Sequence, residues 1–184
     1  MSNLRLIQQP PVIWLTGLSG AGKSTIAVHL KLRLTEQGFA TVILDGDELR
    51  NGLCRGLGFS PEDRTENNRR VGEAAKLLRD VGICVVVALI SPFARDRAAV
   101  RHLIGEGFLE VFVNTPLAIC EIRDSKGLYA KVRKGDIKLF TGLSSPYESP
   151  LAPDIHLDGS EGKKVEEHVH AILEFVTCKG HLQP

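Results

Sequence analysis

A short glycine-rich stretch near the N-terminus carries residue types suited to phosphate binding. Residues 17–25, GLSGAGKST, fit the pattern G-x-x-x-x-G-K-[ST] and lie between an apolar run and a segment of helical periodicity. Glycines there let backbone N–H groups approach phosphate oxygens, while Lys23 reaches the outer phosphates and Ser24 ligates Mg²⁺. The N-terminus of the following helix adds its positive end. The pattern predicts a nucleoside triphosphate site at Gly17, Leu18, Ser19, Gly20, Ala21, Gly22, Lys23, Ser24 and Thr25.

Two carboxylates follow the second apolar run of the chain. Asp45 and Asp47 could hold metal-bound water, orient an acceptor hydroxyl or take its proton. The alternative for Asp47 is that it caps the next helix. Ser91 follows the third apolar run, where it could face the same cleft or cap a helix whose first residue is Pro92.

An aromatic residue and several cations precede and open another helical segment. Phe59 could stack on a flat heterocycle, although Phe packs in a core more commonly. Arg64 lies near the start of this helix, where the dipole disfavours a cation unless an anion lies beside it; a solvated charged face is the alternative. Residues 123–134 are rich in Lys and Arg and could form a lid that closes over a triphosphate.

These residues need a scaffold that brings strand ends together. Short apolar runs at 12–16, 41–44, 83–90, 109–114 and 154–157 are typical of buried parallel strands. Helices are expected at 23–37, 62–80, 93–105, 116–124 and 163–178. The alternation predicts an α/β fold, a mostly parallel five-stranded sheet with helices on both faces, and ligands bound beyond the carboxyl ends of the strands. The irregular stretch 134–153 favours a lid or a substrate-lining segment.

Composition limits the class of protein. A chain of 184 residues suits a single domain spanning 1–184, and the net charge of +1 together with 5% aromatic residues argues against nucleic acid as a partner. The apolar runs are too short to span a membrane, and no signal peptide is apparent. Four cysteines without C-x-x-C spacing indicate a reducing compartment and no structural metal. We therefore expect a cytoplasmic protein.

An ordered series of motifs resembles the adenylyl-sulfate kinase family of P-loop NTPases. After GLSGAGKST come L-D-G-D-x-L-R, L-G-F-S-x-x-D-R-x-E-N-x-R-R, I-S-P-F-x-x-D-R, T-P-L-x-x-C-E-x-R-D-x-K-G-L-Y and F-T-G-L-x-x-P-Y-E. The similarity covers roughly residues 10–178. It implies a three-layer P-loop kinase with a lid and substrate loop near 124–153. Because 184 residues leave no room for the sulfurylase domain fused in some members, the stand-alone form is expected.

The resemblance also implies an activity and a set of site residues. The reaction would transfer the γ-phosphoryl group of ATP, with Mg²⁺, to the 3′-hydroxyl of adenosine 5′-phosphosulfate, giving 3′-phosphoadenylyl sulfate for sulfate assimilation. Lys23 and Asp45 would be catalytic, Ser24 would hold the metal, and Ser91 matches a phosphoserine position described in the family. Phe59 and Phe140 match the pair that sandwiches the substrate adenine. Residues matching the acceptor pocket are Asp45, Gly46, Asp47, Glu48, Phe59, Arg64, Asn67, Ile90, Ser91, Lys126, Leu139 and Phe140.

Two departures and two alternative functions remain open at this point. The family usually has Asn where this chain has Glu48, and commonly Asp where it has Ser144. The alternatives are a P-loop kinase of another nucleotide or small metabolite, and a nucleotide-binding switch protein with little turnover. Members of the family are often homodimers, so a homodimer is expected here as well.

Overall fold

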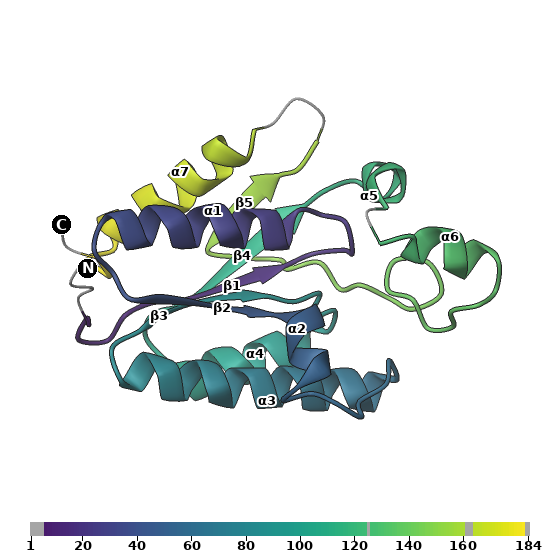
Figure 1. Cartoon of the computed structure of the whole chain (residues 1–184), viewed down its shortest axis with the longest axis horizontal. Helices are drawn as coiled ribbons and strands as arrows, with labels where there is room; N and C mark the ends of the chain where they lie inside the picture. The colour runs from purple at the N-terminus through teal and green to yellow at the C-terminus, as the bar shows by residue number, and fades with distance from the viewer. Residues whose placement is uncertain (1–5, 125, 161–163, 183–184) are drawn as a thin grey trace.

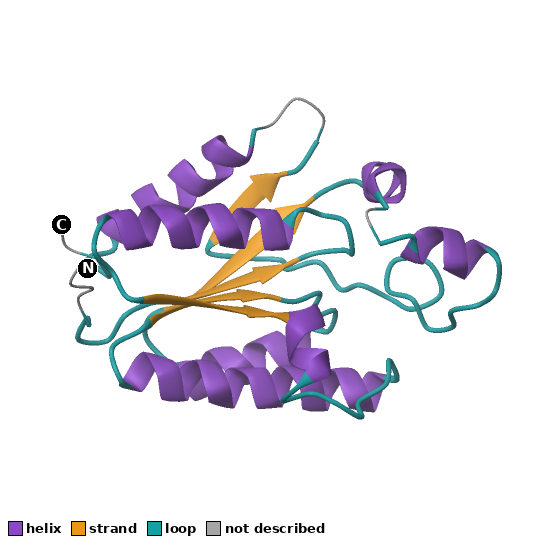
Figure 2. Cartoon of the chain, viewed as in Figure 1, coloured by secondary structure: helices purple, strands orange, loops and turns teal. Residues whose placement is uncertain are grey.

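Helices cover both faces of a central parallel sheet in the computed structural model, which describes residues 6–124, 126–160 and 164–182 (Figures 1 and 2). Within these residues the sheet has five strands, all paired in parallel in the order β2-β3-β1-β4-β5. The strands are β1 (Val12–Thr16), β2 (Thr41–Asp45), β3 (Cys84–Ala88), β4 (Phe108–Asn114) and β5 (Ile155–Asp158). The prediction of an α/β fold with five strands is confirmed, and the sheet is parallel throughout rather than mostly parallel.

The strands form where the sequence is mostly apolar. β1 and β3 are completely buried, because they lie inside the sheet and helices cover both of their faces. The edge strand β5 alternates buried and exposed residues. β3 ends at Ala88, two residues before the predicted limit, and the chain then turns towards the site.

Four long helices form the outer layers. α1 (Lys23–Glu36) and α7 (Val165–Cys178) cover one face, and α3 (Pro61–Asp80) and α4 (Ala94–Ile104) cover the other (Figure 1). Each face buries an apolar cluster of its own, with Leu15, Leu30 and Ile172 in the first and Trp14, Val71 and Val87 in the second. The predicted start of α7 at residue 163 lies outside the described residues.

Three short helices lie beyond the carboxyl ends of the strands: α2 (Gly46–Asn51), α5 (Leu117–Arg123) and α6 (Leu128–Arg133). α6 and the loop after it project at one end of the molecule (Figure 1). The sequence predicted α5 but not α2 or α6, because six residues are too few for a hydrophobic period to be recognised.

Helix starts differ from two of the predicted caps. Asp45, not Asp47, caps α2, because its carboxylate accepts a hydrogen bond from the Asp47 N–H at 2.9 Å. Ser91 does not cap α4, which begins only at Ala94. The Ser60 side chain caps α3, because its hydroxyl accepts a hydrogen bond from the Asp63 N–H.

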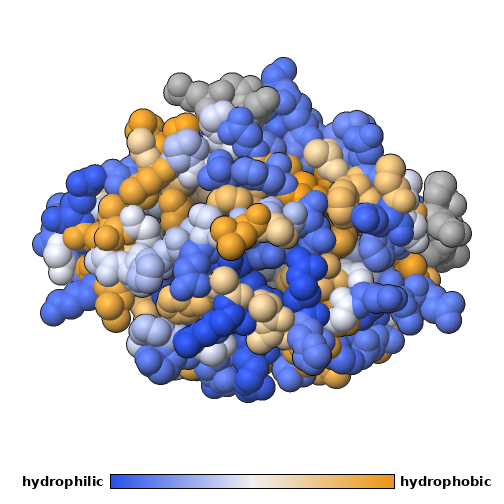
Figure 3. Space-filling view, turned by 180° about the vertical axis from the view of Figure 1, so that it is seen from behind, coloured by the Kyte–Doolittle hydropathy of each residue, from blue (hydrophilic) through white to orange (hydrophobic). Residues whose placement is uncertain are grey.

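The surface mixes polar and apolar residues. On the face shown in Figure 3, hydrophobic residues occur in several separate groups among hydrophilic ones. Among the described residues no helix has the length and apolar character needed to cross a bilayer.

Candidate functional site

A cavity of about 760 Å³ opens at the carboxyl ends of β1, β2 and β3. Its size is in the range of ordinary ligand sites. The register places Asp45 at the end of β2 opposite Ala88 at the end of β3, so segments distant in sequence meet at this edge. Its lining includes residues from the glycine-rich loop, the end of β2, α2, α3 with the segment before it, the β3 exit, α5 and the segments after α5 and α6. These residues include Ser19, Lys23, Ser24, Asp45, Asp47, Arg50, Phe59, Arg64, Asn67, Asn68, Ile90, Ser91, Arg123, Lys126, Leu139 and Phe140.

Two positions of the phosphate loop require glycine, because each lies against a different backbone carbonyl group. Gly17 has a φ of 151°, and a Cβ there would lie 2.6 Å from the Val113 carbonyl oxygen. Gly20 has a φ of 75°, and a Cβ there would lie 2.9 Å from the Cys120 carbonyl oxygen. The loop therefore packs directly against the backbone of β4 and α5, which only glycine permits.

Lys23 is buried at the bottom of this loop. Its ammonium donates hydrogen bonds to the carbonyl oxygens of Gly17 at 3.0 Å and Leu18 at 2.7 Å. The pKa of Lys23 is lowered from 10.5 to about 8, chiefly by burial; Lys126 contributes to the shift, while Cys120 and Asp45 oppose it. A buried ammonium with only carbonyl partners is well placed to neutralise phosphate oxygens.

Carbonyl groups of the loop are held by hydroxyls from outside it. The Tyr129 hydroxyl donates to the Ser19 carbonyl oxygen at 2.9 Å, and the Thr115 hydroxyl donates to that of Ala21 at 2.9 Å. Carbonyl dipoles directed at a phosphate would repel it. The two hydroxyls therefore help to keep the loop in a conformation suited to an anion.

Ser24 and Asp45 present two oxygen atoms beside Lys23 that could act as metal ligands. The Ser24 hydroxyl donates to Asp45 Oδ2 at 2.6 Å, while Asp45 Oδ1 accepts from the Asp47 N–H. In the described part of the chain no three His, Cys, Asp or Glu side chains cluster to form a metal site. A hydroxyl and a carboxylate suit Mg²⁺ when the nucleotide supplies further oxygens.

The opposite side of the cavity carries Phe59, which is 49% exposed, and two guanidinium groups. Arg50 lies over the Phe59 ring at 4.4 Å from its centroid, and Arg64 lies 5.5 Å from the same centroid. Arg64 also donates to the Phe59 carbonyl at 3.1 Å and to the Leu139 carbonyl at 3.1 Å. It thereby joins the two segments that carry the predicted aromatic pair.

The pKa of Arg64 is lowered to about 10, mainly by burial and also by the neighbouring Arg50. Two close, partly desolvated cations favour an anionic ligand between them. The charged residues that line the whole cavity are five cations, Lys23, Arg50, Arg64, Arg123 and Lys126, against two carboxylates, Asp45 and Asp47. The cavity is thus locally cationic although the chain as a whole carries only +1.

Phe140 lies close to Tyr129 in an edge-on arrangement, with ring centroids 4.9 Å apart. It is only 8% exposed, yet it lines the cavity. Leu139 before it has a φ of 58°, a backbone conformation that is strained for a leucine.

Polar groups without a partner also face this region. Among the described residues Asn67 Oδ1 and Asn68 Nδ2 are buried without a hydrogen-bond partner. Both residues lie on the buried face of α3 and line the cavity. Unpaired buried amides are costly, so a ligand that pairs with them is favoured.

Ser91 leaves the sheet with a φ of 39° and is 3% exposed. Its hydroxyl accepts a hydrogen bond from the Trp14 indole N–H at 3.0 Å. Lys126, from the segment after α5, forms an ion pair with Asp47 of α2 across the cavity mouth. This contact brings the predicted lid to the acceptor side.

The structure gathers most of the predicted residues but not all of them. Glu48 is exposed on α2 and does not line the cavity, in contrast to Gly46, Asp47 and Arg50 of the same helix. Of the loop residues, Gly17 and Ala21 are buried in the scaffold, and Leu18 faces a second cavity. Sequence reasoning missed Arg50 and Asn68, although Arg50 ends the L-D-G-D-x-L-R motif and Asn68 lies inside the E-N-x-R-R motif.

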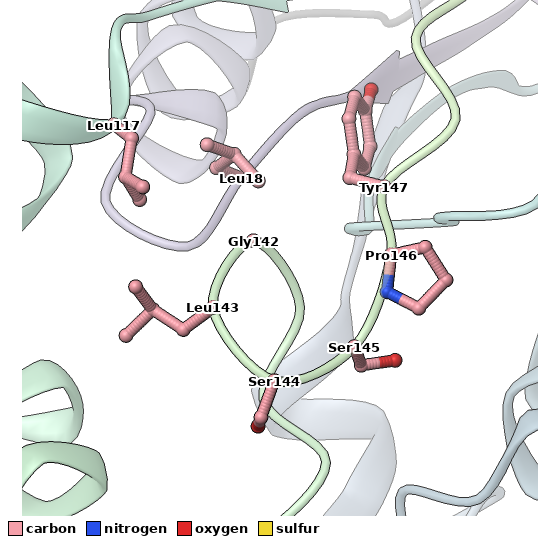
Figure 4. A pocket seen from close by; sticks show the side chains of 8 residues that line it. All are labelled: Leu18, Leu117, Gly142, Leu143, Ser144, Ser145, Pro146 and Tyr147. Atoms are coloured by element: carbon pink, nitrogen blue, oxygen red, sulfur yellow. The ribbon is translucent and has the colours of Figure 1, made fainter.

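The second cavity, of about 550 Å³, lies on the outer side of the phosphate loop (Figure 4). The turn around Gly142 faces Leu18 there, and Tyr147 lines the same hollow (Figure 4). Leu117 and Leu143 make it largely apolar.

Comparisons with known proteins point to one family. The family profile described as Adenylylsulphate kinase matches residues 9–158. The Adenylyl-sulfate kinase of Pseudomonas aeruginosa is 62% identical over 152 residues, covering 82% of this chain and 78% of the relative. That of Vibrio vulnificus is 55% identical over 178 residues, covering 96% of this chain and 86% of the relative.

A solved structure agrees in fold as well as in sequence. The Mycobacterium tuberculosis APS kinase in complex with AMPPNP and APS superposes with a TM-score of 0.88 at 45% identity. The match covers 92% of this chain and 98% of the solved one.

Proposed function

The chain belongs to the adenylyl-sulfate kinase family and transfers the γ-phosphoryl group of ATP to the 3′-hydroxyl of adenosine 5′-phosphosulfate; on that premise, we propose how its own residues carry out the transfer. The observation that carries the proposal is the shared cavity. The phosphate-loop Lys23 and the Phe59 and Phe140 rings line the same space, so two nucleotides can bind facing each other.

On the donor side, the phosphate loop binds ATP. Lys23 moves from the carbonyl oxygens it contacts to the outer phosphates, because an ionic partner is stronger than a neutral one. Arg123 and Lys126 lie at the cavity wall beside the loop and stabilise charge on the transferring group. The solved M. tuberculosis relative binds AMPPNP, which supports ATP as the donor.

On the acceptor side, Phe59 and Phe140 hold the adenine, and Arg50 and Arg64 face the anionic phosphosulfate. Asn67 provides an amide for the ribose side of the substrate. Asp45 orients the 3′-hydroxyl and accepts its proton as the hydroxyl attacks. The loss of that proton makes the hydroxyl oxygen a better nucleophile in line with the γ-phosphorus.

Ser24 and Asp45 would hold Mg²⁺ together with phosphate oxygens of the nucleotide, since their oxygens lie 2.6 Å apart beside the loop. When bound, the ion neutralises charge on the β- and γ-phosphates. Ser91 acts as part of the cavity wall. Its low exposure and its bond to Trp14 favour direct transfer over a phosphoserine intermediate.

We also propose that the chain acts as a single kinase domain, with residues 124–153 as lid and substrate loop, as a homodimer in the cytoplasm. The ion pair between Lys126 and Asp47 supports the lid assignment. Sedimentation equilibrium would test the homodimer.

The test of the function is a coupled assay of ADP release with three acceptors. We expect rapid, Mg²⁺-dependent turnover with adenylyl sulfate and slow turnover with AMP or shikimate. Equal or faster rates with AMP or shikimate would contradict the acceptor assignment. Tight ATP binding without acceptor-stimulated turnover would instead indicate a nucleotide-binding switch.

A further inference from the structure

Tyr147 and Glu148 close the F-T-G-L-x-x-P-Y-E motif, yet neither residue lines the nucleotide cavity. They lie where the substrate loop returns to the sheet. The Tyr147 hydroxyl contacts the last residue of β1, and the polar groups of Glu148 contact the β3 exit and the start of α4.

The Tyr147 hydroxyl bonds to the base of the phosphate loop. It lies 2.9 Å from Thr16 Oγ1, and Thr16 is the last residue of β1, directly before the loop. Thr16 donates its single hydroxyl proton to the Ile90 carbonyl oxygen at 2.8 Å, so Tyr147 must be the donor to Thr16. Burial raises the pKa of Tyr147 to about 12, which keeps this hydroxyl protonated. The result is a relay from Tyr147 through Thr16 to Ile90, which lines the acceptor side.

Glu148 binds the start of α4 with three polar groups. Its N–H donates to the Pro92 carbonyl at 2.8 Å, and its carboxylate accepts from the Ala94 N–H at 2.7 Å. Its carbonyl accepts from Arg97 Nη2 at 2.7 Å. Since Phe93 gives α4 no side-chain cap, Glu148 supplies one from a distant segment, with a charge that suits a helix N-terminus.

Arg97 ties this anchor to the exit of β3. The guanidinium is 3% exposed and also donates to the Ser91 carbonyl at 2.8 Å and to Glu110 Oε1 at 2.6 Å. One buried cation thus holds β3, β4 and the returning loop together. Its carboxylate partner Glu110 keeps the charge compensated.

A tight turn connects the anchor to Phe140. The N–H groups of Leu143, Ser144 and Ser145 all bond to the Phe140 carbonyl, at 3.0 to 3.2 Å. The Phe140 N–H in turn donates to Ser144 Oγ at 2.9 Å. These bonds fix the phenylalanine relative to Ser145, two residues before Tyr147.

The same turn packs on the phosphate loop from outside. Gly142 has a φ of 93°, and a Cβ there would lie 2.9 Å from Leu18 Cδ2 (Figure 4). Only a residue without a Cβ fits this close to Leu18, and both residues line the second cavity. The turn therefore lies between the anchor on one side and the phosphate loop on the other.

We propose that Tyr147 and Thr16 are positioning residues: their hydroxyl contact fixes the return of the substrate loop, and through the turn it sets Phe140 over the acceptor. This inference rests on the proposed function, because it states that the contact affects the binding of adenylyl sulfate and not that of ATP. Neither residue touches substrate or reacting atoms.

The test compares Tyr147→Phe with Tyr129→Phe in the full-length chain. Each change removes one hydroxyl hydrogen bond, to Thr16 or to the Ser19 carbonyl of the phosphate loop. For Tyr147→Phe we expect a roughly 3- to 10-fold higher KM for adenylyl sulfate, with kcat and the KM for ATP within twofold of the parent. For Tyr129→Phe the larger change is expected in the KM for ATP, because its hydroxyl holds the donor loop.

Thr16 variants complete the experiment. Thr16→Ser keeps the hydroxyl and should behave like the parent, whereas Thr16→Val should raise the KM for adenylyl sulfate. The double variant Thr16→Val with Tyr147→Phe should be less than additive, since both changes remove the Tyr147–Thr16 contact, while Thr16→Val also removes the bond to Ile90. The proposal would be overturned if Tyr147→Phe left the KM for adenylyl sulfate unchanged or raised the KM for adenylyl sulfate and for ATP equally. Strictly additive effects in the double variant would also overturn it. Turnover of the parent enzyme tests the function separately, because it does not depend on any variant.

Discussion

The Ser24 hydroxyl donates a hydrogen bond to Asp45 Oδ2 at 2.6 Å, and this pair joins the phosphate loop to the end of β2. One carboxylate therefore borders both halves of the reaction. Its other oxygen caps α2 through the Asp47 N–H, so the backbone fixes its orientation. A carboxylate held in this way can orient a hydroxyl without adopting a new rotamer.

Asp45→Asn should lower kcat about 100-fold or more while leaving the fold intact. Asn is as good a helix cap as Asp, but the amide cannot accept the acceptor proton. Steady-state kinetics and the thermal unfolding midpoint measure the two effects. Asp80→Asn, the same change at an exposed site at the end of α3, should leave both unchanged. A kcat within threefold of the parent for Asp45→Asn would contradict a role as base.

Phe140→Ala should raise the KM for adenylyl sulfate by about 10- to 100-fold, because stacking on one aromatic ring contributes about 1–3 kcal/mol per base. The KM for ATP serves as the internal control and should stay within about threefold. Phe140→Leu should show a smaller rise, since it keeps apolar area without an aromatic face. Equal effects of the Ala and Leu variants would indicate that Phe140 acts by core packing alone.

Ser144→Ala should also raise the KM for adenylyl sulfate, by a few-fold, because the Phe140 N–H loses its hydroxyl acceptor. Ser144→Asp should retain parent-like kinetics, since a carboxylate can accept the same bond. One requirement, a side-chain oxygen that accepts this bond, would then account for both Ser144 here and the Asp that the family resemblance implies at this position. If Ser144→Asp were as impaired as Ser144→Ala, the turn would need another explanation.

ATP affinity should be nearly constant below pH 8 and fall above it. Burial lowers the pKa of Lys23 to about 8 in the ligand-free chain, and the triphosphate binds the ammonium form. Calorimetric titration with a non-hydrolysable ATP analogue from pH 7 to pH 9.5 measures the dependence. Lys23→Met should bind more weakly and with a flatter pH profile. An identical profile in the two proteins would show that another group titrates.

The same pKa shift predicts a stability effect of the opposite sign. A lowered folded pKa means that the folded chain binds fewer protons than the unfolded chain between about pH 8 and pH 10.5. The contribution of Lys23 to the free energy of unfolding should therefore rise with pH across this window. Denaturant titrations of the ligand-free parent and Lys23→Met, compared at each pH, isolate this contribution.

Much of the scaffold could be predicted from local sequence patterns. The five strands and the helices α1, α3, α4, α5 and α7 were each expected within about three residues of their observed ends, because apolar periodicity reports burial directly. The phosphate loop could be predicted equally well from its sequence pattern. The structure adds the reason for two of its glycines, because Gly17 and Gly20 lie too close to neighbouring backbone for a Cβ. Short helices such as α2 and α6 lack such a signal.

The chemistry of the site was partly determined by the sequence and partly by the tertiary structure. The sequence by itself determined that a triphosphate loop and two carboxylates would follow strand ends, and its family resemblance singled out the Phe59 and Phe140 rings. Only the fold decided that Asp45 rather than Asp47 caps α2, that Glu48 faces solvent and that Arg64 joins the two aromatic segments. It also decided that Tyr147 reaches Thr16, 131 residues earlier in the chain. Local sequence patterns determine helices and strands because the residues involved are neighbours along the chain. Contacts between distant residues depend instead on how several helices and strands pack together.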